Sequence, residues 1–359
     1  MKIITIVGAR PQFIKAAAIS RLIRNLENPE FQEILLHTGQ HYDENMSKIF
    51  FDELQIPDPK YNLKISGAGH GATTGRMMEG IERILIEERP DWVLIYGDTN
   101  STLAGALAAA KLHIKVAHVE AGLRSFNMRM PEEINRILSD RLSTLLFCPT
   151  ATAVHNLKNE GVEAGVHNVG DVMYDVAMFY KKQAGEDTQI FKRLGIEQGS
   201  YVLATCHRAE NTDDISRMTE ILNGLKKISE NYQVIFPLHP RTRKVLNDFG
   251  LNNLLIPLTV VEPLSFLDMV ALESAARFIV TDSGGVQKEA FFYGVPCITI
   301  RDETEWVETV ETGWNVIAGA SAVEIVSATA KHKLTSDFKN PYGDGNAAKK
   351  IIELLGAHR

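Results

Sequence analysis

Short apolar runs alternate along this chain with longer stretches in which apolar and polar residues share a helical spacing. Residues 2–7, 91–96 and 115–119 are nearly continuous apolar runs of strand length, which is typical of strands that are buried on both faces. Residues 12–24 and 101–111 have the composition of helices. A strand, a helix and a second strand in succession predict a βαβ unit, whose two strands run parallel.

The same alternation continues to the end of the chain and predicts an α/β protein. Further strands are predicted at 33–37, 145–147, 166–169, 201–205, 233–237, 254–257, 278–281, 296–300 and 315–317, and further helices at 74–88, from Pro131, at 172–184 and at 345–355. The Gly170-Asp171 step separates two series of the same architecture. We therefore place one domain at residues 1–170 and a second domain after it, as a length of 359 residues favours.

Composition and charge narrow the class of protein. The apolar share of 45% and the charged share of 23% are those of a globular protein. A net charge of −7 argues against a nucleic-acid surface, and no apolar run reaches the roughly 20 residues that a membrane span needs. The first strand starts without a charged leader, which predicts no signal peptide. The widely spaced Cys148, Cys206 and Cys297 have no metal-site spacing and suit packing roles in a reducing cytoplasm.

Two carboxylates follow the central strands. Asp98 comes just after the strand at 91–96, and Glu120 comes directly after the strand at 115–119. Because parallel strands end at one edge of a sheet, where open α/β sheets bind ligands, both acids are candidates for a ligand site. The alternative for each is structural: Asp98 caps the next helix, and Glu120 pairs with an arginine on the surface.

The turn after the first strand, Gly8-Ala9-Arg10, leads into a helix with Pro11 at its first position. This turn lacks the GxGxxG spacing of a dinucleotide site, so no NAD is predicted. Arg10 and Lys15 lie in the first turns of the helix, where the helix dipole disfavours cations and an anionic ligand would compensate. The alternative is that both are solvated surface charges.

Two stretches of the first half can be explained either by a structural role or by a role in ligand binding. Residues 64–75 are rich in glycine, which suits either a loop that closes over a ligand or a plain connector. Glu132 and Glu133 fall in the first turn of the helix that starts at Pro131. The helix dipole alone favours acids at that position.

Polar clusters also follow strands of the second half. The run from His207 to Asn211 (His-Arg-Ala-Glu-Asn) comes after one strand, His239 comes after the next, and Arg301 opens a charged cluster after a third. A single histidine is more often a packed core residue than a catalyst. A dense polar run at the carboxyl end of a strand weakens that explanation and favours a ligand site.

The strand at 278–281 leads through a turn of small residues into a helix. Ser283 can cap this helix, and Gly284 and Gly285 let backbone N–H groups approach a phosphate closely. Glu289 lies four residues after Gly285 and returns to the mouth of the helix, where a carboxylate can accept both hydroxyls of a ribose. The alternative is a tight glycine turn beside a surface glutamate.

Taken together and in order, these motifs closely resemble those of the non-hydrolysing UDP-N-acetylglucosamine 2-epimerases. The matching segments span nearly all of the chain and are GARPQFIK, GDTNST, HVEAGLRS, PEEINR, HRAEN, TDSGGVQKE, RDETE and NPYGDG. The resemblance implies an α/β fold of the GT-B type, with two Rossmann-like parallel-sheet domains facing a central cleft. It also implies that residues 341–359 form a helix that crosses back from the second domain, at 171–340, to the first.

The resemblance implies an activity and its partners as well. Members of this family interconvert UDP-GlcNAc and UDP-ManNAc in the cytoplasm as homodimers, without NAD, and supply ManNAc for surface polysaccharides. The catalytic positions correspond here to Asp98, Glu120, Glu132 and His207. Contacts with UDP are implied at Arg10, Lys15, His239, Ser283, Gly284, Gly285, Glu289 and Arg301.

In bacterial members a second UDP-GlcNAc acts as an activator. The resemblance places that site near Gln40, Arg208 and Glu210. This chain has His-Arg-Ala-Glu-Asn from His207 onwards, where some members have His-Arg-Arg-Glu, so it departs from the family within the implied activator site.

The implied chemistry fits these residue types. No carbonyl neighbours C2 of GlcNAc, so its proton becomes acidic only as the C1–O bond breaks, and loss of UDP then gives 2-acetamidoglucal. This route needs carboxylates to move protons and cations or helix N-termini to hold the pyrophosphate. Three alternatives stay open: a hydrolysing 2-epimerase that releases UDP and ManNAc, a GT-B glycosyltransferase, and a non-catalytic nucleotide-sugar binder.

Overall fold

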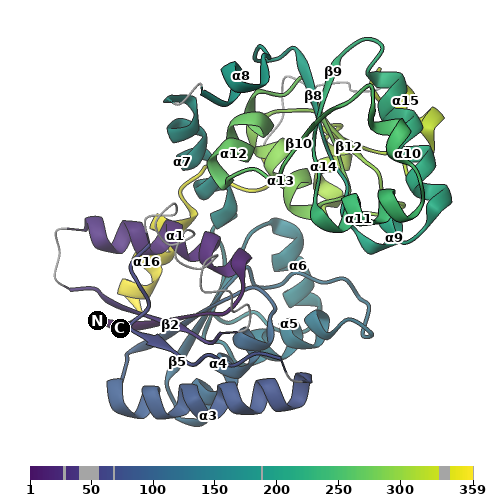
Figure 1. The fold of residues 1–359 in the computed structure, drawn as a ribbon. Helices are drawn as coiled ribbons and strands as arrows, with labels where there is room; N and C mark the ends of the chain where they lie inside the picture. Colours follow the sequence, from purple (N-terminus) through teal and green to yellow (C-terminus); the bar gives the residue numbers. More distant parts are fainter. Residues whose placement is uncertain (27–29, 40–55, 68, 187–188, 331–339, 359) are drawn as a thin grey trace. The chain divides into compact units, whose positions relative to one another are not determined.

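The computed structural model describes residues 1–26, 30–39, 56–67, 69–186, 189–330 and 340–358. The chain forms two compact units: unit 1 comprises Met1–Val176 and Asn340–Arg359, and unit 2 comprises Ala177–Lys339. Each unit has helices around one parallel sheet (Figure 1), so the predicted α/β class with two Rossmann-like sheets is confirmed. The assignment of the catalytic acids to one domain and of UDP binding to the other stays a prediction.

Within the described residues, unit 1 contains a seven-stranded sheet in the order β3-β2-β1-β4-β5-β6-β7, with every neighbouring pair parallel. From β3 to β6 this is the strand order of a dinucleotide-binding fold, which reverses direction between β1 and β4. The strands are β1 (Lys2–Val7), β2 (Gln32–His37), β3 (Tyr61–Asn62), β4 (Trp92–Tyr96), β5 (Lys115–Val119), β6 (Leu145–Cys148) and β7 (Val166–Asn168).

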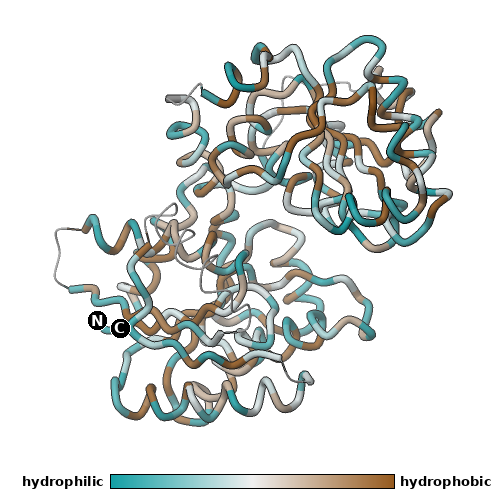
Figure 2. The backbone as a smooth tube through the Cα atoms, viewed as in Figure 1, coloured by the Kyte–Doolittle hydropathy of each residue, from teal (hydrophilic) through white to brown (hydrophobic). Residues whose placement is uncertain are grey.

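Helices cover both faces of this sheet. The helices α1 and α16 pack together on one side, and α3 and α4 pack together on the other (Figure 1). Ile4 and Ile6, alternate residues of β1, join the buried cluster formed with α3 and α4, and hydrophobic positions concentrate along the strands (Figure 2). The helices are α1 (Arg10–Asn25), α3 (His70–Glu88), α4 (Asn100–Lys111), α5 (Pro131–Leu142), α6 (Ala151–Asn159) and α16 (Ala347–Ala357).

The last helix of the chain is attached to unit 1 by a carboxylate. Asp175, in α7 (Val172–Glu186), accepts hydrogen bonds from the backbone N–H groups of Ala347 and Ala348 at 3.1 and 2.8 Å. These are first-turn amides of α16, which have no partner within their own helix. Asp175 therefore caps α16 from a different helix, and α16 packs against α1.

Unit 2 repeats the strand order of unit 1. Its described strands run β10-β9-β8-β11-β12-β13, all parallel, and the order again reverses between β8 and β11. The strands are β8 (Tyr201–Thr205), β9 (Gln233–Pro237), β10 (Thr259–Val261), β11 (Phe278–Thr281), β12 (Cys297–Thr299) and β13 (Asn315–Ile317). The helices are α8 (Gln189–Leu194), α9 (Ala209–Thr212), α10 (Ile215–Ile228), α11 (Pro240–Asp248), η1 (Asn252–Leu255), α12 (Phe266–Ala275), α13 (Gly284–Tyr293), α14 (Val307–Glu311) and α15 (Ala322–Ala328).

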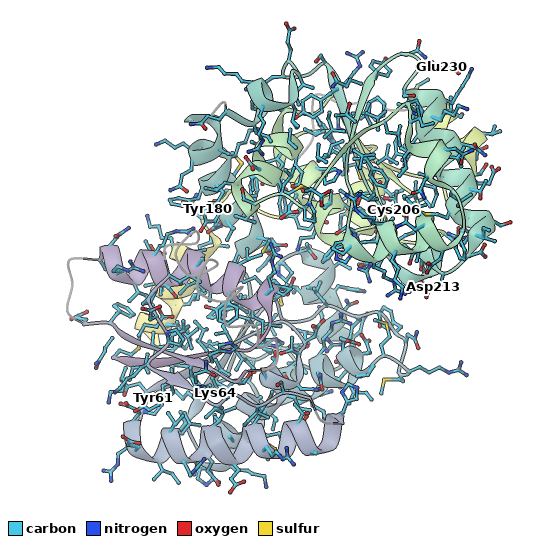
Figure 3. All side chains as sticks on the ribbon, in the orientation of Figure 1. Tyr61, Lys64, Tyr180, Cys206, Asp213 and Glu230 are labelled. Carbon is cyan, nitrogen blue, oxygen red and sulfur yellow. The ribbon has the colours of Figure 1, made fainter. Side chains whose placement is uncertain are left out.

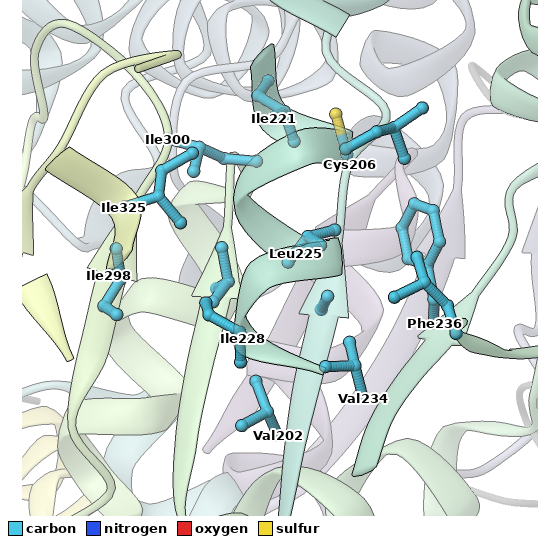
Figure 4. Packing of buried hydrophobic residues seen from close by; sticks show 14 of the residues in the cluster. Val202, Cys206, Ile221, Leu225, Ile228, Val234, Phe236, Ile298, Ile300 and Ile325 are labelled. Carbon is cyan, nitrogen blue, oxygen red and sulfur yellow. The ribbon is translucent and has the colours of Figure 1, made fainter. Parts of the chain in front are cut away.

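The helix α10 shows how local sequence and packing agree in unit 2. Asp214 caps it by accepting hydrogen bonds from the N–H groups of Ser216 and Arg217, at 2.8 and 3.1 Å. The buried side chains of α10 recur at the spacing of one helical face and meet the strands in the core (Figure 4); they are Met218, Ile221, Leu222, Leu225 and Ile228. By contrast, Glu230 lies at the outer edge of the unit (Figure 3).

In the described part of the chain, no helix combines the length and the apolar character that crossing a bilayer requires.

Two predicted elements are corrected by the structure. The strand predicted at 254–257 is wrong, because Asn252–Leu255 forms a short 3-10 helix and strand β10 lies at Thr259–Val261. Ile256 is 83% exposed, so this apolar run is not a buried strand, whereas the β-branched residues of β10 suit one. The helix α3 begins at His70, four residues before the predicted start, so half of the glycine-rich stretch is helix and not a loop.

Gly122 follows β5 and packs closely against α6. Gly161 has a similar left-handed backbone but no close neighbour, so comparing alanine substitutions at the two positions tests that packing. Gly122 has φ +81°, and an added Cβ would lie 2.9 Å from the carbonyl carbon of Ala153, in α6. Gly161 has φ +73° and no atom within 4 Å of an added Cβ. We expect Gly161→Ala to lower the free energy of unfolding by about 1 kcal/mol, from backbone strain alone. We expect Gly122→Ala to lower it by about 3 kcal/mol, since overpacking adds to the strain. Urea unfolding measures both changes, and equal losses would contradict the packing of this turn against α6.

Candidate active site

The candidate acids of unit 1 follow strands that end at the same edge of the sheet. Asp98 lies just beyond β4, and Glu120 directly follows β5, which pairs in parallel with β4 from Trp92↔Lys115 to Tyr96↔Val119. Arg10, the first residue of α1, follows β1, which is the other neighbour of β4. This edge beside the reversal of strand order is where open α/β sheets bind ligands.

Gln12 joins the ends of β1 and β4 across that reversal. Its side chain is buried, and its Oε1 accepts from the N–H groups of Gly8 and Ala9, at 2.8 and 3.1 Å. Its Nε2 donates to the Tyr96 carbonyl at 2.8 Å and to Thr102 Oγ1 at 3.0 Å. All four hydrogen bonds of the amide are made, so the turn after β1 is fixed to the end of β4.

Glu120 pairs with Lys15 at this edge. Glu120 has φ +72°, and its Oε2 bonds the Nζ of Lys15, with both side chains largely shielded from water. Burial alone would lower the pKa of Lys15, but the nearby carboxylates of Glu120 and Asp98 outweigh it and raise that pKa. Glu120 therefore has a shielded lysine of α1 as an ion-pair partner. The anion that compensates Lys15 comes from the chain itself.

Asp98 is paired but is not a helix cap. Its Oδ2 accepts from Arg136 Nη2 at 2.6 Å, and its side chain is 31% exposed. Thr99 is the N-cap of α4, and its hydroxyl accepts from the N–H of Thr102, so the capping alternative for Asp98 is wrong. Asn135, in α5, donates to the Asp98 carbonyl at 2.9 Å. The helix α5 therefore contacts both the backbone carbonyl and the side-chain carboxylate of Asp98.

The two adjacent glutamates of α5 have different environments. Glu133 is buried and accepts from the N–H and hydroxyl of Ser125, the N–H of Phe126, and Arg136 Nη1, at 2.8, 2.9, 3.0 and 2.8 Å. Burial alone would raise the pKa of Glu133, but these donors lower it. Glu132 is exposed. Glu133 therefore fixes the loop before α5, and Glu132 is left accessible to a ligand.

The reversal of strand order in unit 2 has a buried carboxylate at its centre. Asp282, directly after β11, is fully buried and accepts from the N–H groups of His207 and Arg208, both at 2.9 Å. Asn211 Nδ2 donates to the same oxygen at 3.3 Å. One aspartate therefore shapes the whole turn after β8, in the same way that Gln12 shapes the turn after β1.

Two histidines lie near each other beside this turn. The rings of His207 and His239 are 5.8 Å apart between centroids. His239 Nδ1 accepts from the N–H of Arg241 at 3.2 Å and so caps α11. Burial lowers the pKa of His207, with further lowering from His239 and Arg208, and these effects outweigh the opposite effect of Asp282. His207 is therefore a neutral imidazole near pH 7, able to donate one hydrogen bond.

The turn after β11 forms the N-terminus of α13 as predicted from its small residues. Ser283 is the N-cap, with its Oγ 3.5 Å from the N–H of Val286. An added Cβ at Gly285 would lie 3.8 Å from Ser283 Oγ and 4.0 Å from Glu289 Oε2. The Glu289 carboxylate thus returns to the mouth of the helix, near Gly285. This arrangement suits a diphosphate linked to a ribose.

Arg301 and Glu210 are brought together in unit 2. Arg301 Nη1 donates to Glu305 Oε2 at 2.8 Å, and its Nε lies 3.3 Å from Glu210 Oε1. Arg208, two residues before Glu210, is exposed. Gln40 lies outside the described residues.

No group of three or more His, Cys, Asp or Glu side chains among residues placed by the structure is suited to hold a metal ion.

Several residues that shape these sites could not be found from the sequence. Gln12, Asp282 and Arg136 stand inside motifs, but only the structure shows that they bind strand ends or candidate acids. The available signal was weak: Gln12 and Asp282 are polar residues shortly after a strand, and Arg136 lies near the start of α5. The role of Glu133 was likewise hidden, because two adjacent glutamates look alike in the sequence.

Comparisons with known proteins identify the family of the chain. The sequence profile of the family described as UDP-N-acetylglucosamine 2-epimerase matches residues 24–356. A UDP-N-acetylglucosamine 2-epimerase homolog of Methanococcus maripaludis is 53% identical over 360 residues and 99% of both chains. The UDP-2,3-diacetamido-2,3-dideoxy-D-glucuronate 2-epimerase of Pseudomonas aeruginosa is also 53% identical, over 362 residues and 99% of both chains.

A solved structure of a related epimerase has the same fold as this chain. The crystal structure of Methanocaldococcus jannaschii UDP-GlcNAc 2-epimerase in complex with UDP-GlcNAc and UDP has a TM-score of 0.84 and 44% identity, and the match covers 99% of this chain and 100% of that chain. The profile and the relatives both extend over almost the whole sequence. The chain therefore belongs to the UDP-N-acetylglucosamine 2-epimerase family.

Proposed function

We propose that the chain is a non-hydrolysing epimerase that inverts C2 of UDP-GlcNAc to give UDP-ManNAc, and catalyses the reverse reaction. It would act without a cofactor, as a cytoplasmic homodimer, and supply ManNAc for surface polysaccharides. The nucleotides named for the Methanocaldococcus jannaschii structure support this substrate. The observation that carries the proposal is the pair of acids at one edge of the unit 1 sheet, Asp98 and Glu120, each bonded to a cation.

The proposed reaction is an elimination followed by an addition. A carboxylate takes the proton from C2 while the C1–O bond breaks, and the electron pair of that bond leaves with UDP to give 2-acetamidoglucal. A second acid then protonates C2 from the opposite face, and an oxygen of UDP adds back to C1. More than one carboxylic acid is required, because the two faces of one carbon must be served.

The environments of the acids suit these roles. Asp98 and Glu120 lie at one sheet edge and are each held by a cation, Arg136 and Lys15, so either carboxylate can be positioned to take the C2 proton. Glu132 is exposed at the start of α5 and can supply or orient the proton for the other face. Glu133 is excluded from that role because its hydrogen bonds hold the loop before α5.

Unit 2 offers groups that suit UDP. The backbone N–H groups at the N-terminus of α13 favour the negative charge that builds on the diphosphate as the C1–O bond breaks. A neutral His207 can donate to a phosphate oxygen, and Glu289 can accept the ribose hydroxyls. Further contacts are proposed at Arg10, Lys15, His239 and Arg301.

A second candidate substrate is favoured by one comparison. The chain is more similar to the Pseudomonas aeruginosa enzyme, at 53% identity, than to the Methanocaldococcus jannaschii structure, at 44%. The sugar named for the Pseudomonas enzyme has an acetamido group at C3 and a carboxylate at C6. Neither group changes the chemistry at C2, so the same acids would serve UDP-2,3-diacetamido-2,3-dideoxy-D-glucuronate.

A buried acid lies behind Glu289. Glu273, in α12, is 3% exposed and shares a hydrogen bond with Glu289. Burial raises the pKa of Glu273 well above its ordinary value, and the Glu289 carboxylate raises it further. Glu273 therefore keeps its proton and donates it to Glu289, which orients the carboxylate proposed to bind ribose.

The proposed function is tested by incubating the protein with UDP-GlcNAc in D2O and following the sugar and phosphorus signals by NMR. We expect deuterium at C2 in intact UDP-ManNAc and in recovered UDP-GlcNAc. Free UDP with free ManNAc would show a hydrolysing epimerase, and an unchanged substrate would exclude epimerisation of UDP-GlcNAc. A parallel incubation with the diacetamido glucuronate nucleotide compares kcat/KM for the two substrates.

The same assay tests the acids. We expect Asp98→Asn, Glu120→Gln and Glu132→Gln each to lower kcat by about 100-fold to 10,000-fold, the range for loss of a general acid or base. Glu82→Gln, at an exposed position of α3, is the control and should keep the activity of the unsubstituted protein. Near-normal kcat in all three variants would remove the acid–base assignment.

The proton on Glu273 predicts a dependence of stability on pH. Because the pKa of Glu273 is raised in the folded state, the folded protein holds a proton that the unfolded chain releases above about pH 4.5. Stability from this group is thus fully present below that pH and falls as pH rises towards the folded pKa. In the unsubstituted protein we expect this group to lower the free energy of unfolding on the order of 1 kcal/mol per pH unit over that range. Glu273→Gln keeps a donor to Glu289 but has no proton to lose, so this fall should be absent. Thermal unfolding from about pH 5 to about pH 8, with the exposed Glu197→Gln as control, measures this. Parallel curves for all three proteins would contradict the protonated pair.

A further inference from the structure

A buried histidine bridges the two elements that carry the acids of unit 1. His118, in β5, is fully buried. Its Nε2 lies 2.7 Å from the carbonyl oxygen of Gly97, and its Nδ1 lies 2.7 Å from Asp140 Oδ1, in α5. The ring therefore links the turn that carries Asp98 to the helix that carries Glu132. Nothing in the proposed reaction uses it.

Both neighbours of the ring are hydrogen-bond acceptors. A carbonyl oxygen cannot donate. Asp140 also accepts from Arg124 Nη1 at 2.7 Å and from the N–H of Gly122 at 3.2 Å. Burial favours the neutral acid, but His118 and Arg124 outweigh it and lower the pKa of Asp140, and the guanidinium and the N–H that donate to one oxygen suit an ionised carboxylate without reference to His118. A neutral imidazole has a single N–H. One of the two ring nitrogens would then face an acceptor oxygen at hydrogen-bond distance with no proton between them.

The charges around the ring lead to the same state. Arg124 pairs with Asp140 and with Glu160, at 2.7 Å in each case, and the Arg124 and Asp140 side chains are each 1% exposed. Glu160 is 28% exposed and shares its charge with water, whereas the buried Asp140 shares its guanidinium with Glu160 and gains a cation partner of its own only if His118 is protonated. Cys148 also lies near Asp140, and burial, with a contribution from Asp140, raises its pKa to about 12. It is therefore a neutral thiol and does not change the balance.

We propose that His118 carries a proton on each ring nitrogen and that this buried imidazolium positions Asp98 for proton exchange with the sugar. His118 is then a positioning residue, and this role rests on the proposed function of Asp98. Gly97 has φ +61°, and its carbonyl is held through His118 from Asp140. Asn135 holds the next carbonyl, that of Asp98, at 2.9 Å. The helix α5 thus fixes two consecutive carbonyls of the turn, and His118 provides the buried link.

The charge state can be measured without reference to turnover. In protein labelled with 15N-histidine, the ring signals of His118 are those lost in His118→Gln. We expect both ring nitrogens to carry protons at pH 7, and we expect Asp140→Asn, which removes the facing negative charge, to leave one of them bare. A bare ring nitrogen in the unsubstituted protein, or no change in Asp140→Asn, would overturn the proposal.

The positioning role is tested by two matched substitutions. The amide of His118→Gln reaches the place of Nε2 and can still donate to Gly97, whereas that of His118→Asn reaches the place of Nδ1 and donates only to Asp140. We expect kcat to stay within about 10-fold for His118→Gln and to fall by about 100-fold or more for His118→Asn. We expect KM to change by less than about 3-fold in both, because UDP binding is not affected.

The outcomes separate the two claims. Equal kcat in the two variants, at equal thermal unfolding temperatures, would overturn the positioning role. If the unsubstituted protein does not epimerise its nucleotide sugar, the proposed function fails, and the NMR result still decides the charge state of His118. If His118→Asn does not fold, His118→Leu, which also leaves the Gly97 carbonyl without a donor, replaces it: a fall in kcat of about 100-fold supports the role, and kcat equal to that of His118→Gln overturns it.

Discussion

The reversal of strand order within each parallel sheet is the constraint on which the rest of this structure depends. The crossovers from β1 and β4 leave in opposite directions, and so do those from β8 and β11. Among the described elements this reversal marks the sheet edge where open α/β folds bind ligands. In unit 1 this edge receives Asp98 and Glu120 with their cations. In unit 2 it receives the turn that begins at His207 and the N-terminus of α13.

Each edge is held in shape by buried polar side chains that bind backbone groups. Gln12 and His118 bind consecutive carbonyls at the end of β4, and Asp282 binds two consecutive N–H groups after β8. Buried polar groups are costly unless all their hydrogen bonds are made. When all hydrogen bonds of these buried side chains are made, the turns are held in one conformation. The residues proposed to contact the substrate are therefore attached to rigid turns.

Much of the fold could be predicted from the sequence, because buried parallel strands are continuous apolar runs and the helices between them are amphipathic. The failure at 254–257 came from an apolar run that packs from outside the sheet, with Ile256 exposed. The acids and the α13 turn could be placed because they follow strands directly. The partners could not: His118 and Asp140 are 22 residues apart, and their contact depends on how α5 packs against the strand ends.

The central claim is that the bond between C1 and the diphosphate breaks and re-forms while UDP stays bound. The most direct measurement uses UDP-GlcNAc with 18O in the oxygen that joins C1 to the β-phosphorus, followed by 31P NMR during epimerisation. The account predicts that the label spreads to the non-bridging oxygens of the β-phosphate in the nucleotide sugars. Inversion of C2 with all of the label still in the bridge would contradict it.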